Sequence, residues 1–258
     1  MFAFGSRRAL RMIERNLLVY KHGWLVLFSG FFEPLFYLLS IGFGLGRLVG
    51  DVTGPGGEPI PYALFVAPAL LAASAMNGAI TESTFNFFFK LNYDKTFASI
   101  LTTPMSPADI SLGELAWALI RGGLYTVGFL AVMVLFGMVR SPLILLTLPG
   151  ALLIGFAFAA VGMAATSFMR TWQDFDLIQL VVLPMFLFSG TFFPLDSFPE
   201  GARIIIQLTP LYQGVDLLRT LAVGVVGPDT LVHVAYLTTM GLIGLAVVSR
   251  RLDKLLLK

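Results

Sequence analysis

Long apolar stretches alternate with short polar stretches along this chain of 258 residues. Six apolar stretches approach or exceed the length of about 18 residues that distinguishes a membrane-spanning helix from a buried helix of a soluble protein. Helices satisfy their own backbone hydrogen bonds in lipid, and the sequence lacks the alternation typical of barrel strands. The pattern predicts an all-α, polytopic integral membrane protein with six transmembrane helices, at about 24–46, 62–88, 115–138, 143–168, 177–193 and 230–249.

The composition agrees with this prediction. Hydrophobic residues make up 57% of the chain and charged residues 12%, whereas a soluble domain contains about 25% charged residues. The polar remainder is small, so we expect an amphipathic helix within residues 1–23 and one membrane domain over residues 24–258. The chain contains no cysteine, which excludes disulfides. Its net charge of +2 gives no reason to expect a nucleic-acid partner.

Lysine and arginine are unequally distributed between the two sides of the predicted spans. With the N-terminus in the cytosol, six crossings place 13 of the 17 basic residues on the cytosolic side. The four outside are Arg47, Arg140, Arg203 and Arg219. By the positive-inside rule, we expect a multi-pass protein of the cell inner or plasma membrane with both termini in the cytosol.

The segment before the first span, residues 6–21, has the pattern of an amphipathic helix. Its arginines share one helical face: Arg7, Arg8, Arg11 and Arg15. Apolar side chains such as Leu10 and Leu17 share the other face. Such a helix lies in the membrane interface with its arginines toward lipid phosphates. It serves either as a juxtamembrane anchor or as a lever joined to a cytosolic partner.

Residues 89–114 form the main interruption on the predicted cytosolic side. Phe97, Ile100 and Leu101 have the i, i+3, i+4 spacing of a short helix with one apolar face. Pro104 ends this helix. The segment is either a docking site for another protein or a plain loop.

A second helix is predicted to begin directly after this short one. Ser106 has the position of an N-cap residue, Pro107 of the first helical residue and Asp109 of the acid at the third. A helix over residues 107–138 would rise about 48 Å, whereas the hydrocarbon core of a bilayer is about 30 Å thick. The second and third spans are therefore expected to project into the cytosol.

Residues 195–227 are too apolar for a free loop and too interrupted by proline and glycine to cross the membrane. The spacing predicts two short helices, over about 199–208 and 211–223, that dip into the outer leaflet. Ser197 and Glu200 have the spacing of a capping box at the start of the first. This re-entrant helical hairpin is either a structural plug or an outer gate over a translocation path.

Few charged side chains interrupt the apolar stretches. Glu33 lies near the middle of the first span, where a carboxyl costs about 2.5–3.5 kcal/mol unless it is protonated or paired. Its carboxyl either makes a structural hydrogen bond to a neighbouring helix or has a role in binding a substrate or a proton. Asp216 and Arg219 are three residues apart and can pair on one helical face. The sequence contains no phosphate-binding loop, no metal-ligand cluster and no nucleophile–base pattern, so we expect no catalytic residue and no metal site.

Three sequence blocks resemble a known family. Residues 93–114 read YDKTFASILTTPMSPADISLGE, and FSGTFFPLDSFP at 188–199 is followed by TPLYQGVDLLR at 209–219. Together with six spans behind an amphipathic helix, they resemble the permease subunits of type-2 ABC exporters. The likeness is strongest to the group that includes nodulation-factor and anthracycline exporter permeases, and it runs through nearly the whole chain. Gln213 stands where this family has His or Tyr.

The resemblance implies a subunit that binds no cofactor itself. ATP and Mg would bind a separate cytosolic ABC ATPase, present in two copies, and a second permease protomer would complete a homodimer. The complex would export an amphiphilic substrate, such as a drug, lipid or glycolipid. The coupling segment, residues 91–113, would contact the ATPase around Phe97, Ile100, Leu101, Thr102 and Thr103.

The resemblance also implies that the first and fifth spans line a translocation path between the protomers. The candidate path or gate residues are Glu33, Phe188, Phe192, Phe193, Tyr212 and Gln213. Membrane lipid is a further expected partner. The alternative is an ion-coupled secondary transporter that acts without an ATPase.

Overall fold

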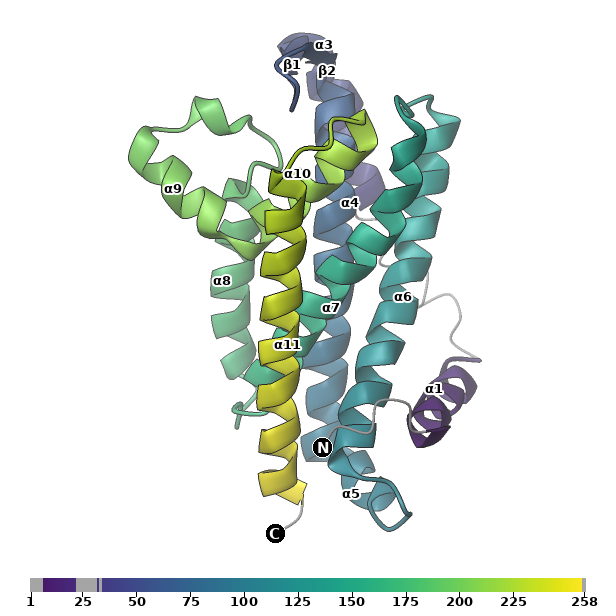
Figure 1. The fold of residues 1–258 in the computed structure, drawn as a ribbon. Helices are drawn as coiled ribbons and strands as arrows, with labels where there is room; N and C mark the ends of the chain where they lie inside the picture. Colours follow the sequence, from purple (N-terminus) through teal and green to yellow (C-terminus); the bar gives the residue numbers. More distant parts are fainter. Residues whose placement is uncertain (1–6, 22–31, 33, 257–258) are drawn as a thin grey trace.

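The computed structural model describes residues 7–21, 32 and 34–256 of the chain. An elongated bundle of long helices surrounds the central helix α4 (Figure 1). The helices of the bundle are α4 (Tyr62–Thr81), α6 (Pro107–Leu135), α7 (Thr147–Thr166), α8 (Asp174–Phe188) and α11 (Asp229–Leu256). We call the end that carries α5 (Thr96–Ile100) and the last turn of α11 the α5 end, and the opposite end the hairpin end.

The remaining elements are short. At the α5 end they are α1 (Arg7–Tyr20), η2 (Glu82–Asn86), η3 (Phe89–Tyr93) and α5 (Thr96–Ile100). Toward the hairpin end they are η1 (Leu38–Leu45), α3 (Gly46–Val49), β1 (Asp51–Thr53), β2 (Pro59–Pro61), η4 (Pro142–Leu146), η5 (Leu195–Ser197), α9 (Glu200–Leu208) and α10 (Pro210–Val223). The two strands pair antiparallel, with Asp51 opposite Pro61, and they are a small addition to the predicted all-α fold. Strands of three residues are too short to produce a visible alternation in the sequence.

Four helical stretches in the described part of the chain are long and apolar enough to cross a membrane: Tyr62–Tyr93, Pro107–Leu135, Pro142–Thr166 and Asp229–Leu256. They correspond to the predicted second, third, fourth and sixth spans. The predicted fifth span is α8, whose 15 residues rise only about 22 Å. Part of the predicted first span lies outside the described residues. The count of six spans therefore stays a prediction.

Two of the four stretches are longer than a bilayer requires. The α4 rod, which we define as the 32 residues Tyr62–Tyr93, rises about 48 Å, and the 29 residues of α6 rise about 43 Å. The start of α6 is confirmed. Ser106 and Asp109 form a reciprocal capping box, in which the Asp109 N–H donates to Ser106 Oγ at 3.2 Å and the Ser106 N–H donates to the Asp109 carboxylate at 3.0 Å. The end comes earlier than predicted, at Leu135, because Gly137 turns the chain with φ +69°.

The two short helices predicted within residues 195–227 are confirmed as α9 and α10. The predicted capping box of Ser197 and Glu200 is wrong. Pro199 takes the N-cap position of α9, and no side chain caps the helix there. Ser197 lies in the preceding turn η5 instead. Whether this hairpin enters the membrane stays a prediction.

Arg219 of α10 is buried and joins three parts of the bundle. Its Nε donates to the carbonyl oxygen of Phe65 on α4 at 3.2 Å, and its Nη2 donates to the carbonyl oxygen of Gly190 at 2.7 Å. The guanidinium carbon lies 3.8 Å from the centroid of the Phe65 ring. The predicted pairing of Asp216 with Arg219 is therefore wrong. Asp216 Oδ2 lies 3.0 Å from Nε2 of His233 on α11 instead.

Four charged side chains lie between the α4 rod and α6, and we call them the ionic cluster: the buried Glu82, Glu114 and Arg121, and the partly buried Lys90. Arg121 Nη1 lies 2.5 Å from Glu82 Oε2. Lys90 Nζ lies 2.6 Å from Glu114 Oε2 and 3.6 Å from Glu82 Oε1. Each side chain is at most 12% exposed. Because two cations offset two carboxylates, these charges can be buried without leaving an unpaired one.

Helix α1 is attached to this cluster. Figure 1 shows α1 beside α6, toward the α5 end. The Asn16 side chain donates to Glu114 Oε1 at 3.4 Å. The Tyr20 ring stacks on Trp117 of α6, with centroids 5.4 Å apart. The cluster therefore fixes three elements relative to one another: α1, the α4 rod and α6.

The cluster gives a test of the fold. Arg121→Gln should lower the free energy of unfolding by about 3–5 kcal/mol, because it leaves the Glu82 carboxylate buried without its cation. Glu82→Gln combined with Arg121→Gln should lower the free energy of unfolding by less than the sum of the two single changes. The comparison is a double-mutant cycle, measured by unfolding of the protein in detergent.

Arg11→Gln is the matched control for this cycle. Arg11 pairs with Glu14 at 2.7 Å, but the two side chains are 75% and 58% exposed, so little or no loss is expected. Equal losses for Arg11→Gln and Arg121→Gln would contradict a structural role for the cluster.

Candidate functional site

The α5 end carries a short helix set across the ends of the α4 rod and α6 (Figure 1). Lys95 turns the chain into this helix with a left-handed backbone, φ +48°. Phe97 is fully buried, and its ring centroid lies 5.0 Å from that of Phe87. This aromatic contact attaches α5 to the α4 rod, so the two elements are expected to move together.

The five residues predicted for coupling differ in exposure. Phe97 is buried, Ile100 and Leu101 are half-buried, and Thr102 and Thr103 are exposed. The two threonine hydroxyls each donate to the carbonyl oxygen three residues earlier, at 2.8 and 2.6 Å. Phe97 thus supports this tip from the inside, while the two threonines form part of its accessible surface. A role of these residues in coupling stays a prediction.

The N-terminal helix α1 is joined to the same tip. Arg8 Nη1 donates to the carbonyl oxygen of Pro104 at 2.5 Å, and Met12 is buried against α6. Leu10 and Leu17 are more than half exposed on the apolar face. In the predicted basic face, Arg8 and Arg11 are exposed and Arg15 is half-buried. A helix with one face on the bundle and an exposed apolar face is suited to the membrane interface.

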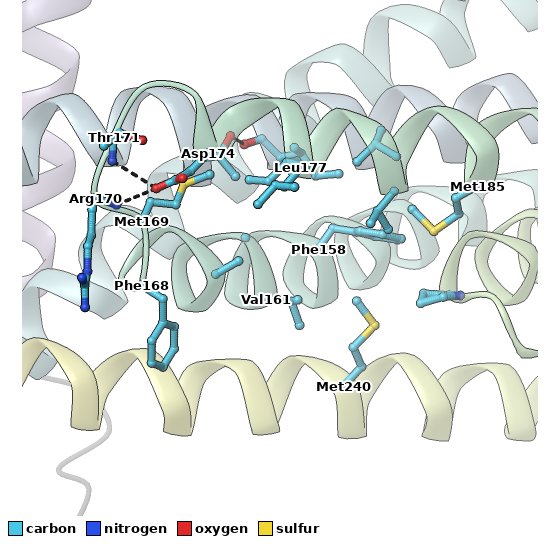
Figure 2. Close-up of a pocket in the computed structure, with 18 residues that line it drawn as sticks. Phe158, Val161, Phe168, Met169, Arg170, Thr171, Asp174, Leu177, Met185 and Met240 are labelled. Carbon is cyan, nitrogen blue, oxygen red and sulfur yellow. Dashed lines mark hydrogen bonds between the residues drawn. The ribbon is translucent and has the colours of Figure 1, made fainter.

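Helix α8 is the least buried of the long helices, since Phe175 is its only buried residue. Two apolar grooves flank it. The first, which we call the methionine groove, has a volume of about 780 Å³ and lies between α7, α8 and α11. Figure 2 shows Phe158, Val161 and Met240 facing this space from α7 and α11. The lining is almost wholly apolar along its length.

Polar groups gather at one end of the methionine groove, the α5 end (Figure 2). The Asp174 carboxylate accepts the backbone N–H of Arg170 at 2.7 Å and that of Thr171 at 3.0 Å. These donors lower the pKa of the Asp174 carboxyl, because they stabilise its ionised form. The groove is therefore apolar along its length and charged at one mouth.

The second groove, which we call the aromatic groove, lies between α8 and residues 37–52 and has a volume of about 760 Å³. Tyr37, Phe186 and Phe192 form its aromatic wall, with ring centroids 5.8 Å apart for Tyr37 and Phe186 and 5.3 Å apart for Phe186 and Phe192. Gln179 adds an amide group to the lining. The groove thus brings together parts of the predicted first and fifth spans.

The structure places the three predicted gate phenylalanines near the hairpin end of α8. Phe192 is buried in the wall of the aromatic groove, and Phe193 lines the same groove and is exposed. Phe188 is exposed outside it. Phe188 and Phe193 each lie 6.4 Å, between ring centroids, from Phe198. Two of the three therefore line one groove.

Two other gate candidates, Tyr212 and Gln213, lie on α10. Tyr212 is half-buried on α10, and Gln213 Oε1 lies 2.5 Å from Nδ1 of His233. His233 is also bonded to Asp216, so it joins α10 to α11. In the sequence Asp229 and Thr230 stand four and three residues before His233, and only the packing of α10 and α11 reveals that its partners are Gln213 and Asp216. Glu33 lies outside the described residues.

Comparison with known families identifies the fold. Residues 8–222 match the ABC-2 type transporter family. This range extends from α1 through α10, and it includes the tip at α5 and the whole of α8. This match confirms the family that the three sequence blocks resemble.

Curated relatives agree over most of the chain. Nodulation protein J of Rhizobium leguminosarum bv. viciae is 31% identical over 254 residues, which cover 96% of both chains. Nodulation protein J of R. leguminosarum bv. trifolii is 32% identical over 254 residues, covering 96% of this chain and 95% of the relative. That of Rhizobium meliloti strain 1021 is 33% identical over 223 residues, covering 86% and 82%. The chain therefore belongs to the ABC-2 type transporter membrane family, as a permease subunit, and this family implies an ATP-binding partner subunit.

Proposed function

We propose that this chain is the permease of an ATP-driven exporter that moves an amphiphilic molecule, such as a drug, lipid or glycolipid, out of the cytoplasm. Two copies form a homodimer in the inner or plasma membrane, with six spans each and both termini in the cytosol. Each copy docks one ATPase, which binds ATP and Mg. The observation that carries the proposal is the family match over residues 8–222, which includes both the tip and α8.

The α5 end supports a docking role. The α4 rod and α6 rise about 48 and 43 Å, more than the hydrocarbon core of about 30 Å, so they can hold α5 outside the lipid. Phe97 attaches α5 to the rod, and Arg8 bonds α1 to Pro104 at the tip. A partner that displaces this tip would therefore move α1, α5 and the rod together.

The aromatic groove supports a role as the path. Aromatic rings beside a small number of amide groups suit a ligand with one apolar and one polar part. The groove is bounded by α8, whose outer face exposes Leu180, Leu183 and Leu187. We propose that a second protomer covers this face and closes the path.

The ionic cluster supports a passive permease over an ion-coupled carrier. A carrier needs an ionisable group inside the membrane that can bind and release its ion. Among the described residues, Glu82 lies within the bundle but is paired with Arg121 and approached by Lys90. Its charge is already balanced by the protein, so we propose that the energy comes from the ATPase.

The docking surface is tested by an exposed threonine at the tip. Thr102→Arg should lower recovery of the ATP-binding subunit with the tagged permease from native membranes by about tenfold, a loss of about 1.4 kcal/mol, because the larger charged side chain occupies the contact. Thr53→Arg makes the same replacement at an exposed position of β1 and should leave the recovery of the ATP-binding subunit unchanged. Equal recovery from both variants would contradict docking at α5.

The orientation is tested by single cysteines, since the chain contains none of its own. Glu58 and Ala98 are exposed at the hairpin end and the α5 end. Glu58→Cys should react with a membrane-impermeant maleimide on intact cells, and Ala98→Cys should react only after the cells are permeabilised. Labelling of Ala98→Cys on intact cells would place the tip outside the cell and exclude a cytosolic ATPase at this site.

The dimer seam is tested in the same cysteine-free background. Leu180 on α8 and Leu231 at the start of α11 are 71% and 73% exposed. Oxidation of native membranes should produce a disulfide-linked dimer with Leu180→Cys, because two copies of α8 meet at the proposed seam. Leu231→Cys should give little disulfide-linked dimer. Similar dimer yields for both variants would argue against a seam at α8.

A further inference from the structure

We infer that the methionine groove binds an anionic phospholipid of the surrounding bilayer, with one acyl chain along α8 and the phosphate at Arg170 and Arg251. This site is separate from the aromatic groove, and lipid binding there does not depend on whether the chain transports a substrate. The inference rests on the shape of the groove, its lining and the charges at its mouth.

The length of the groove suits one acyl chain in one leaflet. Its lining on α8 runs from Asp174 to Met185, which is a rise of about 16 Å. One leaflet contributes about half of a hydrocarbon core of about 30 Å. The volume of about 780 Å³ is lined by apolar side chains from α7, α8 and α11. Met185 and Met240 line the groove away from Asp174 (Figure 2), and methionine side chains adapt to irregular apolar ligands.

The mouth of the groove has cationic groups that can bind a lipid phosphate. The Arg170 side chain is exposed beside the mouth (Figure 2). Phe168 lines the groove, and the Arg251 guanidinium carbon lies 4.7 Å from the centroid of its ring. Arg251 Nε donates to the carbonyl oxygen of Ser167 at 3.4 Å, which holds the guanidinium at this position. Guanidinium groups match phosphate geometry better than an ammonium does.

Asp174 is the one acidic residue among those that line this groove. Its carboxylate accepts two backbone N–H groups, from Arg170 and Thr171, so part of its charge is already compensated. The two arginines leave the mouth positive, which favours an anionic over a neutral headgroup. Charge complementarity therefore identifies an anionic phospholipid rather than a zwitterionic one as the occupant.

The position of the groove indicates what the lipid does. The methionine and aromatic grooves lie on adjacent faces of α8, which share Val182. Helix α8 has little packing against protein on either side. A lipid chain in the methionine groove would fill the space behind α8 and support the wall of the aromatic groove.

The experiment uses the full-length chain in detergent with added phosphatidylglycerol or phosphatidylcholine, and counts bound lipids by native mass spectrometry. The wild type should retain phosphatidylglycerol about tenfold better than phosphatidylcholine. The double variant Arg170→Gln, Arg251→Gln should lose this preference. Arg140→Gln removes an exposed positive charge at the hairpin end, and this variant should keep the preference for phosphatidylglycerol.

A second variant tests the acyl-chain site. Val161 is 37% exposed and faces the groove, so Val161→Trp should fill the space and reduce binding of both lipids. Leu242→Trp, at an exposed position of α11 outside the groove lining, should leave binding unchanged. The inference is overturned if the wild type binds both lipids equally, if the double arginine variant keeps the preference, or if Val161→Trp retains lipid like Leu242→Trp.

Discussion

The pairing of charges between the α4 rod and α6 is the constraint on which the rest of the bundle depends. Carboxylates and cations inside an apolar bundle are tolerated only when each finds an opposite charge. Arg121 bonds Glu82, and Lys90 reaches both acids of the cluster. The contact of Asn16 with Glu114 brings α1 onto the same interface. One neutral cluster thus sets the relative position of the three elements that meet at the α5 end.

Helix α8 is held in the opposite way. Along its length it borders two grooves, whereas beyond its hairpin end the chain is fixed by two buried hydrogen bonds. Arg219 donates to the carbonyl oxygen of Gly190, and the Tyr62 hydroxyl donates to that of Phe192. At its other end the buried Phe175 packs on Phe85 and Phe88, with ring centroids 4.6 and 5.2 Å away. A helix that is anchored at its ends and loosely packed along its length is the kind of element that can shift between two positions. In the proposed exporter, α8 is the wall of the aromatic groove that moves to open the path.

The sequence predicted best where the deciding interaction lies between near neighbours in the chain. The start of α6 depends on Ser106 and Asp109, three residues apart, and the capping box is present. The same kind of spacing failed at Ser197 and Glu200, because Pro199 takes the N-cap position. It failed again at Asp216, which is bonded to His233 of another helix rather than to Arg219. Spacing shows which contacts are possible, and the competing partners come from packing.

The sequence by itself determined that this protein is helical and membrane-bound, and its motifs indicated the permease family. Hydrophobic run length, helix caps and motif residues depend on local chemistry, so they can be read without a structure. Only the tertiary structure decided that Phe97 is internal, that Glu82 pairs with Arg121 at a distance of 39 residues, and that α8 stands between two grooves. Each of these depends on which helices lie side by side, and many arrangements of apolar helices are compatible with one hydrophobic pattern.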